Sequence, residues 1–112
     1  MRYTDTQLPA LDRSPREFDI DFDPGKRVLK PYGDLDRFTS SILLAAAKAF
    51  TEELPGDVTI DCAEVTFADR ALVKVLSDLR DDQREQGRAV KIVNQTLPIR
   101  RLFLLTGFRA ST

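Results

Sequence analysis

The spacing of apolar residues along this chain alternates between a period of two, typical of strands, and a period near 3.6, typical of helices. The clearest case is the segment 57–87. Residues 57–62 alternate apolar with polar and are rich in β-branched side chains, which predicts a strand. Beyond Asp69 the spacing becomes helical, with Asp69 as the expected N-cap and Gly87 as the left-handed terminator. The apolar stripe of this helix is Leu72, Val75, Leu76 and Leu79.

The segments before this unit follow the same two patterns. Residues 18–23 alternate strictly, which predicts a half-buried antiparallel strand, and a turn leads to a second strand over 27–32. The leucine- and alanine-rich residues 41–54 predict a helix, for which Thr39 or Ser40 is the expected cap. Its predicted buried stripe is Ile42, Ala45, Ala46, Ala49 and Phe50.

After the central unit, residues 89–93 predict a short strand and Thr96 is the expected cap of a last helix that ends at Gly107. The order β-β-α-β-α-β-α predicts an α/β fold, a mixed four-stranded sheet with the helices on one face. We expect residues 1–16 to form a flexible extension and residues 17–112 to form the domain. The predicted stripe of the last helix is Ile99, Leu102, Phe103 and Thr106, with Arg100 and Arg101 outside.

Composition narrows the class of protein. The 112 residues are 42% hydrophobic and 31% charged, as in a soluble globular domain, and the net charge of −1 argues against bulk binding to nucleic acid or to an anionic membrane. The longest apolar run, residues 42–47, is too short to span a bilayer, and the N-terminus has no signal pattern, so we expect a cytoplasmic protein. The chain has no histidine, and its one cysteine, Cys62, is expected to pack in the core. We therefore expect no catalytic triad, no metal site, no cofactor and no enzymatic activity.

Three motifs resemble those of one known family. Residues 65–76 resemble the signature V-x-F-x-D-S-S-G-L-x-x-L of STAS domains, which include the bacterial anti-sigma-factor antagonists. Residues 33–36 resemble the family's G-x-L-D loop, and residues 97–108 resemble its closing helix. The resemblance covers residues 18–108 in the family's order and spacing, and it implies the STAS fold. It also implies a protein-binding role: sequestering a kinase-like anti-sigma factor and so freeing a sigma factor.

The chain departs from the family pattern at one important point. In the family, the second serine of D-S-S-G accepts phosphate from the partner kinase. Here Arg70 and Ala71 occupy the two serine positions, and Leu72 occupies the glycine position. Because Ala71 has no hydroxyl group, it cannot be phosphorylated. The resemblance therefore implies a regulator that stays in the unphosphorylated, binding-competent state, as a monomer or a weak dimer.

The loops at the helix N-termini, residues 33–36, 63–71 and 94–97, are the expected place for a partner, because backbone N–H groups and the positive end of the helix dipole gather there. With the resemblance, they predict a partner-binding set of Asp34, Asp36, Thr66, Asp69, Arg70 and Ala71. Arg70 has two interpretations. Either neighbouring aspartates screen it, or it meets an acidic patch or a phosphate on a partner.

Two other functions are compatible with the sequence. One is a sensor that holds a nucleotide or lipid between the sheet and the N-terminal segment. The other is a scaffold subunit of a larger STAS assembly. A ligand-induced rise in melting temperature would favour the sensor, and a stable oligomer would favour the scaffold.

Overall fold

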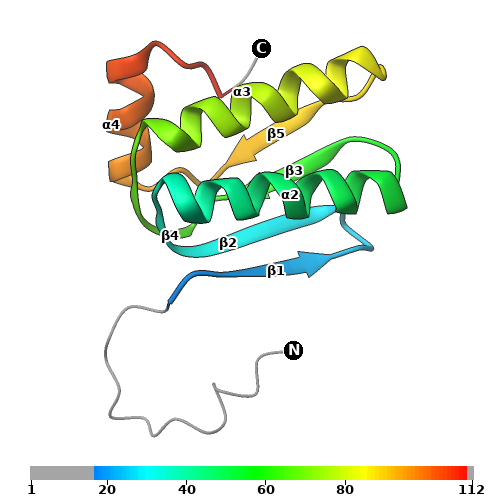
Figure 1. Ribbon diagram of the computed structural model, residues 1–112, viewed down its shortest axis with the longest axis horizontal. Coiled ribbons are helices and arrows are strands. Elements are labelled where there is room, and N and C mark those ends of the chain that lie inside the picture. The colour runs from blue at the N-terminus through cyan, green and yellow to red at the C-terminus, as the bar shows by residue number, and fades with distance from the viewer. Residues whose placement is uncertain (1–16, 111–112) are drawn as a thin grey trace, which may run out of the picture.

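In the computed structural model, which describes residues 17–110, a mixed five-stranded sheet carries three helices (Figure 1). The predicted extension 1–16 lies outside the described residues. The strands are β1 (Asp19–Asp23), β2 (Val28–Leu35), β3 (Val58–Asp61), β4 (Glu64–Ala68) and β5 (Val90–Val93). The helices are α2 (Arg37–Glu53), α3 (Arg70–Glu85) and α4 (Leu97–Thr106).

Strand β2 is the centre of the sheet. It pairs antiparallel with β1 and parallel with both β3 and β4, and β5 pairs parallel with β3 on the far side. The predicted mixed sheet is thus confirmed, with one strand more than expected. The prediction of a loop over residues 63–71 is wrong for 64–68, which form β4. Because β2 runs on to Leu35 rather than stopping at Tyr32, its extra backbone groups need a partner, and β4 supplies it.

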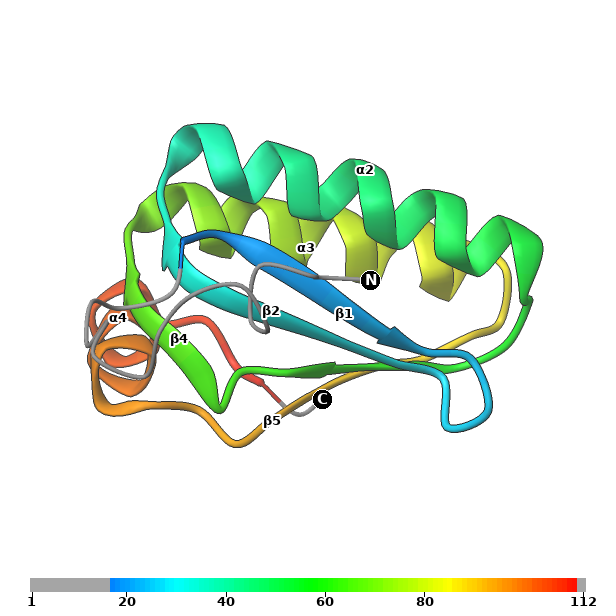
Figure 2. The same ribbon diagram turned by 90° about the horizontal axis from the view of Figure 1, so that it is seen from below.

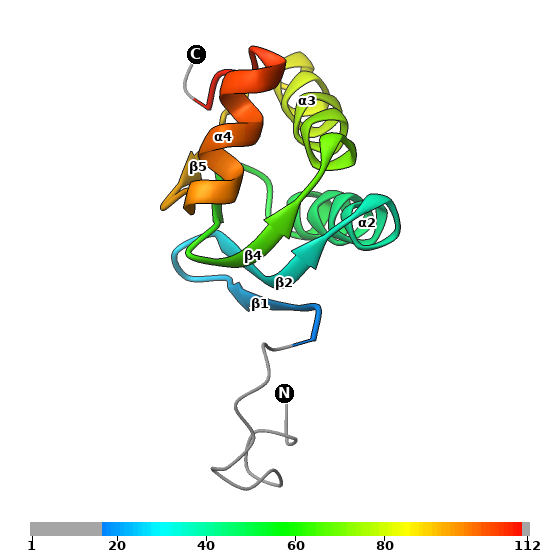
Figure 3. The same cartoon turned by 90° about the vertical axis from the view of Figure 1, so that its left-hand side faces the viewer.

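Helices α2 and α3 lie side by side on one face of the sheet, as predicted (Figure 2). Helix α4 lies at one end of the sheet, where it packs against β4 and α3 (Figure 3). The hydroxyl of Thr96, the residue before α4, donates a hydrogen bond to the backbone carbonyl of Val65 in β4 (3.0 Å). Thr96 occupies the N-cap position but makes no side-chain cap bond, so its hydroxyl attaches α4 to the sheet instead.

The predictions for α3 are confirmed, and so are those for α4 apart from the expected cap bond of the Thr96 side chain. Asp69 caps α3, and Gly87 follows its end with a φ of 73°. Gly107 ends α4 in the left-handed conformation, and Thr106 is half-buried. The predicted stripes are otherwise buried: Leu72, Val75, Leu76 and Leu79 in α3, and Ile99, Leu102 and Phe103 in α4.

The prediction for α2 is wrong in two respects. The helix begins at Arg37 rather than near residue 41, and its cap is Asp36 instead of Thr39 or Ser40. Of the predicted stripe only Phe50 is buried, and the actual buried face is Ser40, Leu43, Ala47, Phe50 and Thr51. Leucine and alanine occur all round this helix, so the apolar pattern does not fix which side faces inward. Packing against β2 and α3 selects the side.

The core lies between the sheet and the helices and includes Cys62, as predicted. Removal from water, and secondarily the charge of Asp61, raises the pKa of the Cys62 thiol to about 12. Within residues 17–110, no helix is both long and apolar enough to cross a membrane.

Candidate functional site

Two helix N-termini meet at one end of the sheet. The parallel strands β2 and β4 end beside each other, with Leu35 opposite Ala68, and each strand is followed directly by the N-cap of a helix. The Asp69 N–H donates a hydrogen bond to the Leu35 carbonyl (3.2 Å), which joins the two turns. All six predicted binding residues lie at this end of the sheet: two are in the ends of the strands, Asp34 in β2 and Thr66 in β4, and the other four are at the helix starts. We call them the helix-start surface: Asp34, Asp36, Thr66, Asp69, Arg70 and Ala71.

The start of α2 is held by a reciprocal capping box. The Asp36 carboxylate accepts the Thr39 N–H (2.9 Å), and the Thr39 hydroxyl oxygen accepts the Asp36 N–H (2.9 Å). The same hydroxyl donates to the Asp34 carbonyl (2.7 Å). The hydrogen bonds from Thr39 lower the pKa of the Asp36 carboxyl group. Asp36 therefore has a structural role in capping α2.

The start of α3 is built in a similar way. The Asp69 carboxylate accepts the Ala71 N–H (2.9 Å), and the Asp34 carboxylate accepts the Thr66 hydroxyl (2.5 Å). Each of the three aspartates is thus bonded to a local donor. Arg70, the first residue of α3, is exposed, and its side chain makes no ion pair with any residue in the range 17–110. Screening by the nearby aspartates requires no direct ion pair, so both interpretations of Arg70 stay predictions.

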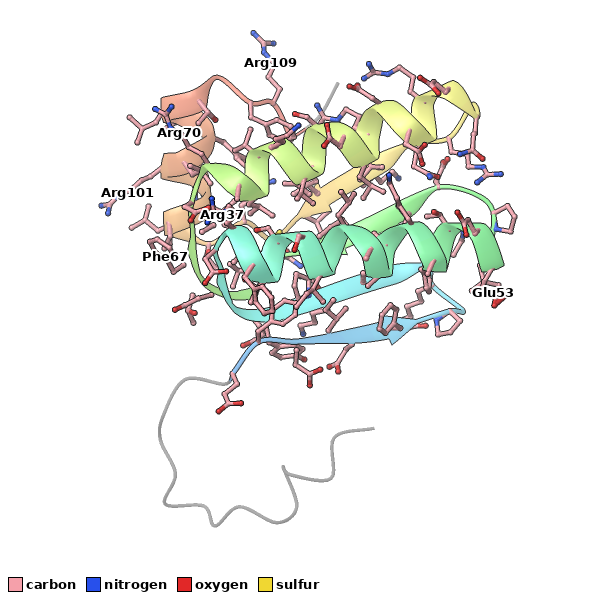
Figure 4. The ribbon with its side chains drawn as sticks, viewed as in Figure 1. Arg37, Glu53, Phe67, Arg70, Arg101 and Arg109 are labelled. Atoms are coloured by element: carbon pink, nitrogen blue, oxygen red, sulfur yellow. The ribbon has the colours of Figure 1, made fainter. Side chains whose placement is uncertain are left out.

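The N-terminal end of α3 is exposed to solvent within the described part of the chain. Thr66, Phe67 and Arg70 are exposed, whereas Asp69 and Ala71 are half-buried. Helix α4 packs beside this turn, and the Arg37, Phe67, Arg70 and Arg101 side chains lie at this end of the molecule (Figure 4). Within the described residues, the exposed part of the helix start is therefore Thr66, Phe67 and Arg70.

Two aromatic side chains at this end, Phe38 (71% exposed) and Phe67 (49% exposed), were not among the binding residues predicted from the sequence. Strict alternation in β4 would bury Phe67 together with Val65. A β-bulge prevents this, because the register shifts so that Gly33 pairs with Val65 and Asp34 with Phe67, leaving Thr66 as the extra residue. Phe38 was missed because the start of α2 was predicted too late. The bulge itself left no signal in the sequence.

The chemistry of this surface favours recognition of another molecule. It combines two helix N-termini, whose dipoles are positive there, with exposed phenyl rings and with the guanidinium group of Arg70, which forms no ion pair with a described residue. Among the residues that the structure describes, no three Asp, Glu or Cys side chains come close enough to hold a metal ion. Fold and surface together define an α/β domain with the features of a binding module.

The family follows from the sequence profile described as "Mlab, STAS domain", which matches residues 18–110. The chain belongs to the STAS domain family, so the resemblance of its three motifs is confirmed.

Solved structures share the fold. The anti-sigma factor antagonist SpoIIAA in its unphosphorylated form is 13% identical, with a TM-score of 0.66 over 81% of each chain. An anti-sigma factor antagonist from Mycobacterium paratuberculosis is 23% identical, with a TM-score of 0.68 over 81% of this chain and 77% of that one. No curated protein sequence matches the chain. At these identities the likeness establishes the fold, which agrees with the predicted STAS architecture.

Proposed function

We propose that this protein is a non-enzymatic, cytoplasmic antagonist of an anti-sigma factor, and that it binds a kinase-like anti-sigma factor through the helix-start surface. The observation that carries the proposal is the exposed start of α3, where Arg70 forms no ion pair with a described residue and Ala71 stands in place of the serine. Membership in the STAS family and the fold shared with anti-sigma factor antagonists support it.

The charges of the surface indicate the kind of partner region it would bind. Asp36 and Asp69 are engaged as caps, and Asp34 is engaged by Thr66, so these carboxylates are partly neutralised by local donors. Arg70 remains as a cation beside two positive helix ends. An acidic patch or a phosphate group on the partner is the complementary feature. Phe38 and Phe67 would serve as apolar anchors beside it.

Ala71 determines how the interaction is regulated in this proposal. A phosphoserine at that position would add nearly two negative charges next to the Asp69 carboxylate and would reverse the local charge. Alanine has no hydroxyl group that could accept phosphate, so a partner kinase cannot block binding by phosphorylating this position. The protein would remain competent to bind whether or not ATP is present.

The test uses the host's kinase-like anti-sigma factors, each mixed with this protein and ATP. We expect one of them to form a complex that ATP does not dissociate, with no phosphate on this chain by intact-mass spectrometry. The matched variant Ala71→Ser should gain one phosphate and lose the complex on addition of ATP. Phosphate on Thr66 of the wild-type protein would contradict a binding surface that cannot be phosphorylated. The absence of any complex would contradict the proposed role.

The docking surface is tested by calorimetry with the anti-sigma factor that binds. Arg70→Glu should weaken the affinity at least about tenfold, because it reverses a charge at the centre of the interface. Lys48→Glu, an exposed lysine in the second half of α2, is the matched control and should leave the affinity unchanged. Equal affinities for both variants would place the interface elsewhere.

A further inference from the structure

The outward face of α4 is a second surface with an unusual composition. Leu104 and Leu105 are 84% and 82% exposed, the highest values among the large apolar side chains of residues 17–110. Helical spacing places Arg100 beside Leu104 and Arg101 beside Leu105. We call this the α4 patch: Arg100, Arg101, Leu104, Leu105 and Arg109. None of these five residues belongs to the helix-start surface or to the buried core.

An open hollow of about 480 Å³ adjoins the patch. Phe103 and Phe108 contribute rings to its lining, and Arg100 and Arg109 also line it. Arg109 extends away from the body of the protein on this side (Figure 4). The hollow therefore combines an aromatic lining with two guanidinium groups.

The wall of the hollow is fixed by contacts with α3. The Arg80 guanidinium lies over the Phe108 ring, 4.4 Å from its centroid, and donates a hydrogen bond to the Arg109 carbonyl (2.5 Å). The rings of Phe103 and Phe108 are in contact, with centroids 4.8 Å apart. Arg80 thus holds residues 108–109 against α3, and these contacts within the chain fix the wall of the hollow.

The charge of the C-terminal region indicates which kind of molecule the α4 patch would bind. Residues 94–112 contain three arginines and no aspartate or glutamate, although the whole chain has a net charge of −1. We propose that the α4 patch binds an acidic segment of a partner protein, with one apolar side chain of that segment in the hollow and its carboxylates paired with Arg100 and Arg109. This second interface is separate from the helix-start surface, and it does not depend on the function proposed for that surface.

Three other occupants fit less well. A small anion would leave Leu104 and Leu105 in water. A second copy of the same patch would bring arginines of like charge together. A membrane would meet only a small apolar face on α4, Leu97, Leu104 and Leu105. The opposite side of this ten-residue helix is buried.

The test is selection of a phage-displayed library of random peptides of about twelve residues, long enough for three helical turns, against the full chain. We expect the enriched peptides to combine aspartate or glutamate with a leucine or aromatic anchor. Their affinity, measured by fluorescence polarisation, should fall at least about tenfold for Leu104→Ser/Leu105→Ser and for Arg100→Glu/Arg101→Glu. Both pairs of residues are exposed, so the variants should keep the wild-type melting temperature, which serves as the check on folding.

Two control variants separate the two surfaces. Lys48→Glu and Arg70→Glu should bind the selected peptides as the wild-type protein does. The proposal is overturned if no peptide is enriched relative to the leucine double variant, or if the enriched peptides lack carboxylates. Cosedimentation with vesicles of phosphatidylglycerol and phosphatidylcholine that the leucine double variant abolishes would also overturn it. So would a dimer in sedimentation that the same variant dissociates.

Discussion

Arg70 stands at the position in α3 where a positive charge is least favourable. It is the first helical residue, next to the N-cap Asp69, and its side chain is exposed. The N-terminus of a helix carries a partial positive charge, so a cation there is destabilising and a carboxylate is stabilising. We predict that Arg70→Glu makes the protein more stable while it weakens partner binding.

The magnitude follows from two contributions. A charge in the first turn contributes about 0.3–1 kcal/mol, and the substitution both removes the cation and adds a carboxylate. Arg70 also lies four residues before Lys74, so a repulsive pair becomes an attractive one, a change of about 0.2–0.5 kcal/mol for each sign. The new carboxylate lies next to Asp69 and the site is exposed to solvent, so repulsion and screening offset part of the gain. We expect a net increase of about 1 kcal/mol in the free energy of unfolding, which corresponds to a rise of about 4 °C in melting temperature.

Urea denaturation followed by circular dichroism measures this difference. The experiment is done in low salt and in about 1 M NaCl, where the Debye length falls to about 3 Å. The gain should be present in low salt and should largely disappear in high salt. Arg70→Gln removes the cation without adding a carboxylate and should give about half of the gain.

The opposite end of the same helix supplies the matched control. Arg84 lies in the last turn of α3, where a cation is favourable, and it lies 3.8 Å from Asp81. Arg84→Glu should therefore destabilise the protein, although the chemical change is the same as in Arg70→Glu. Two results would refute the reasoning: a loss of stability in Arg70→Glu, or a gain that persists in high salt.

Three further predictions concern the frame around the two surfaces. Asp69→Ala removes the cap bond to the Ala71 N–H and should cost about 1 kcal/mol by urea denaturation, and an unchanged stability would contradict this. Gln83 is fully buried, its Oε1 has no described partner, and its amide nitrogen donates only long bonds, to the Thr51 hydroxyl (3.2 Å) and to the Asp82 carboxylate (3.5 Å). Gln83→Met should therefore raise the free energy of unfolding by about 1 kcal/mol, whereas a lower melting temperature would argue against an unsatisfied oxygen. Burial raises the pKa of the Cys62 thiol to about 12 in the folded protein, whereas the pKa of an unfolded cysteine is about 8.5. The stability that comes from keeping this thiol protonated is therefore complete below a pH of about 8.5 and is lost as the pH rises through about 12. Wild-type stability should accordingly fall relative to Cys62→Val between pH values of about 8 and 10.

The sequence predicted α3 well because its determinants are local. The Asp69 cap bonds an N–H only two residues away, and the terminating Gly87 needs only its own left-handed backbone. The side chains outside the apolar stripe are largely polar, so only one face of the helix can turn inward. The family motifs lie in this segment and in the loops beside it, which is why the STAS fold could be predicted from the chain alone.

The prediction was weakest where neighbours distant in sequence decide the outcome. Helix α2 is apolar on several sides, so contacts with β2 and α3 determined that Leu43 is buried and Ile42 partly exposed. The loop predicted over residues 63–71 became a strand because β2 continues to Leu35 and offers it a hydrogen-bonding edge.

The amino-acid sequence by itself determined the order of the elements other than β4, the cap and the buried face of α3, and the absence of a phosphorylatable hydroxyl at Ala71. Tertiary structure alone decided which side chains are exposed at the two proposed surfaces. A bulge in the pairing of β4 with β2 exposed Phe67, and the contact of Arg80 with Phe108 formed the hollow beside α4. Caps and periodic stripes depend on interactions within a few residues, whereas exposure depends on the register between strands and on packing between helices far apart in the chain.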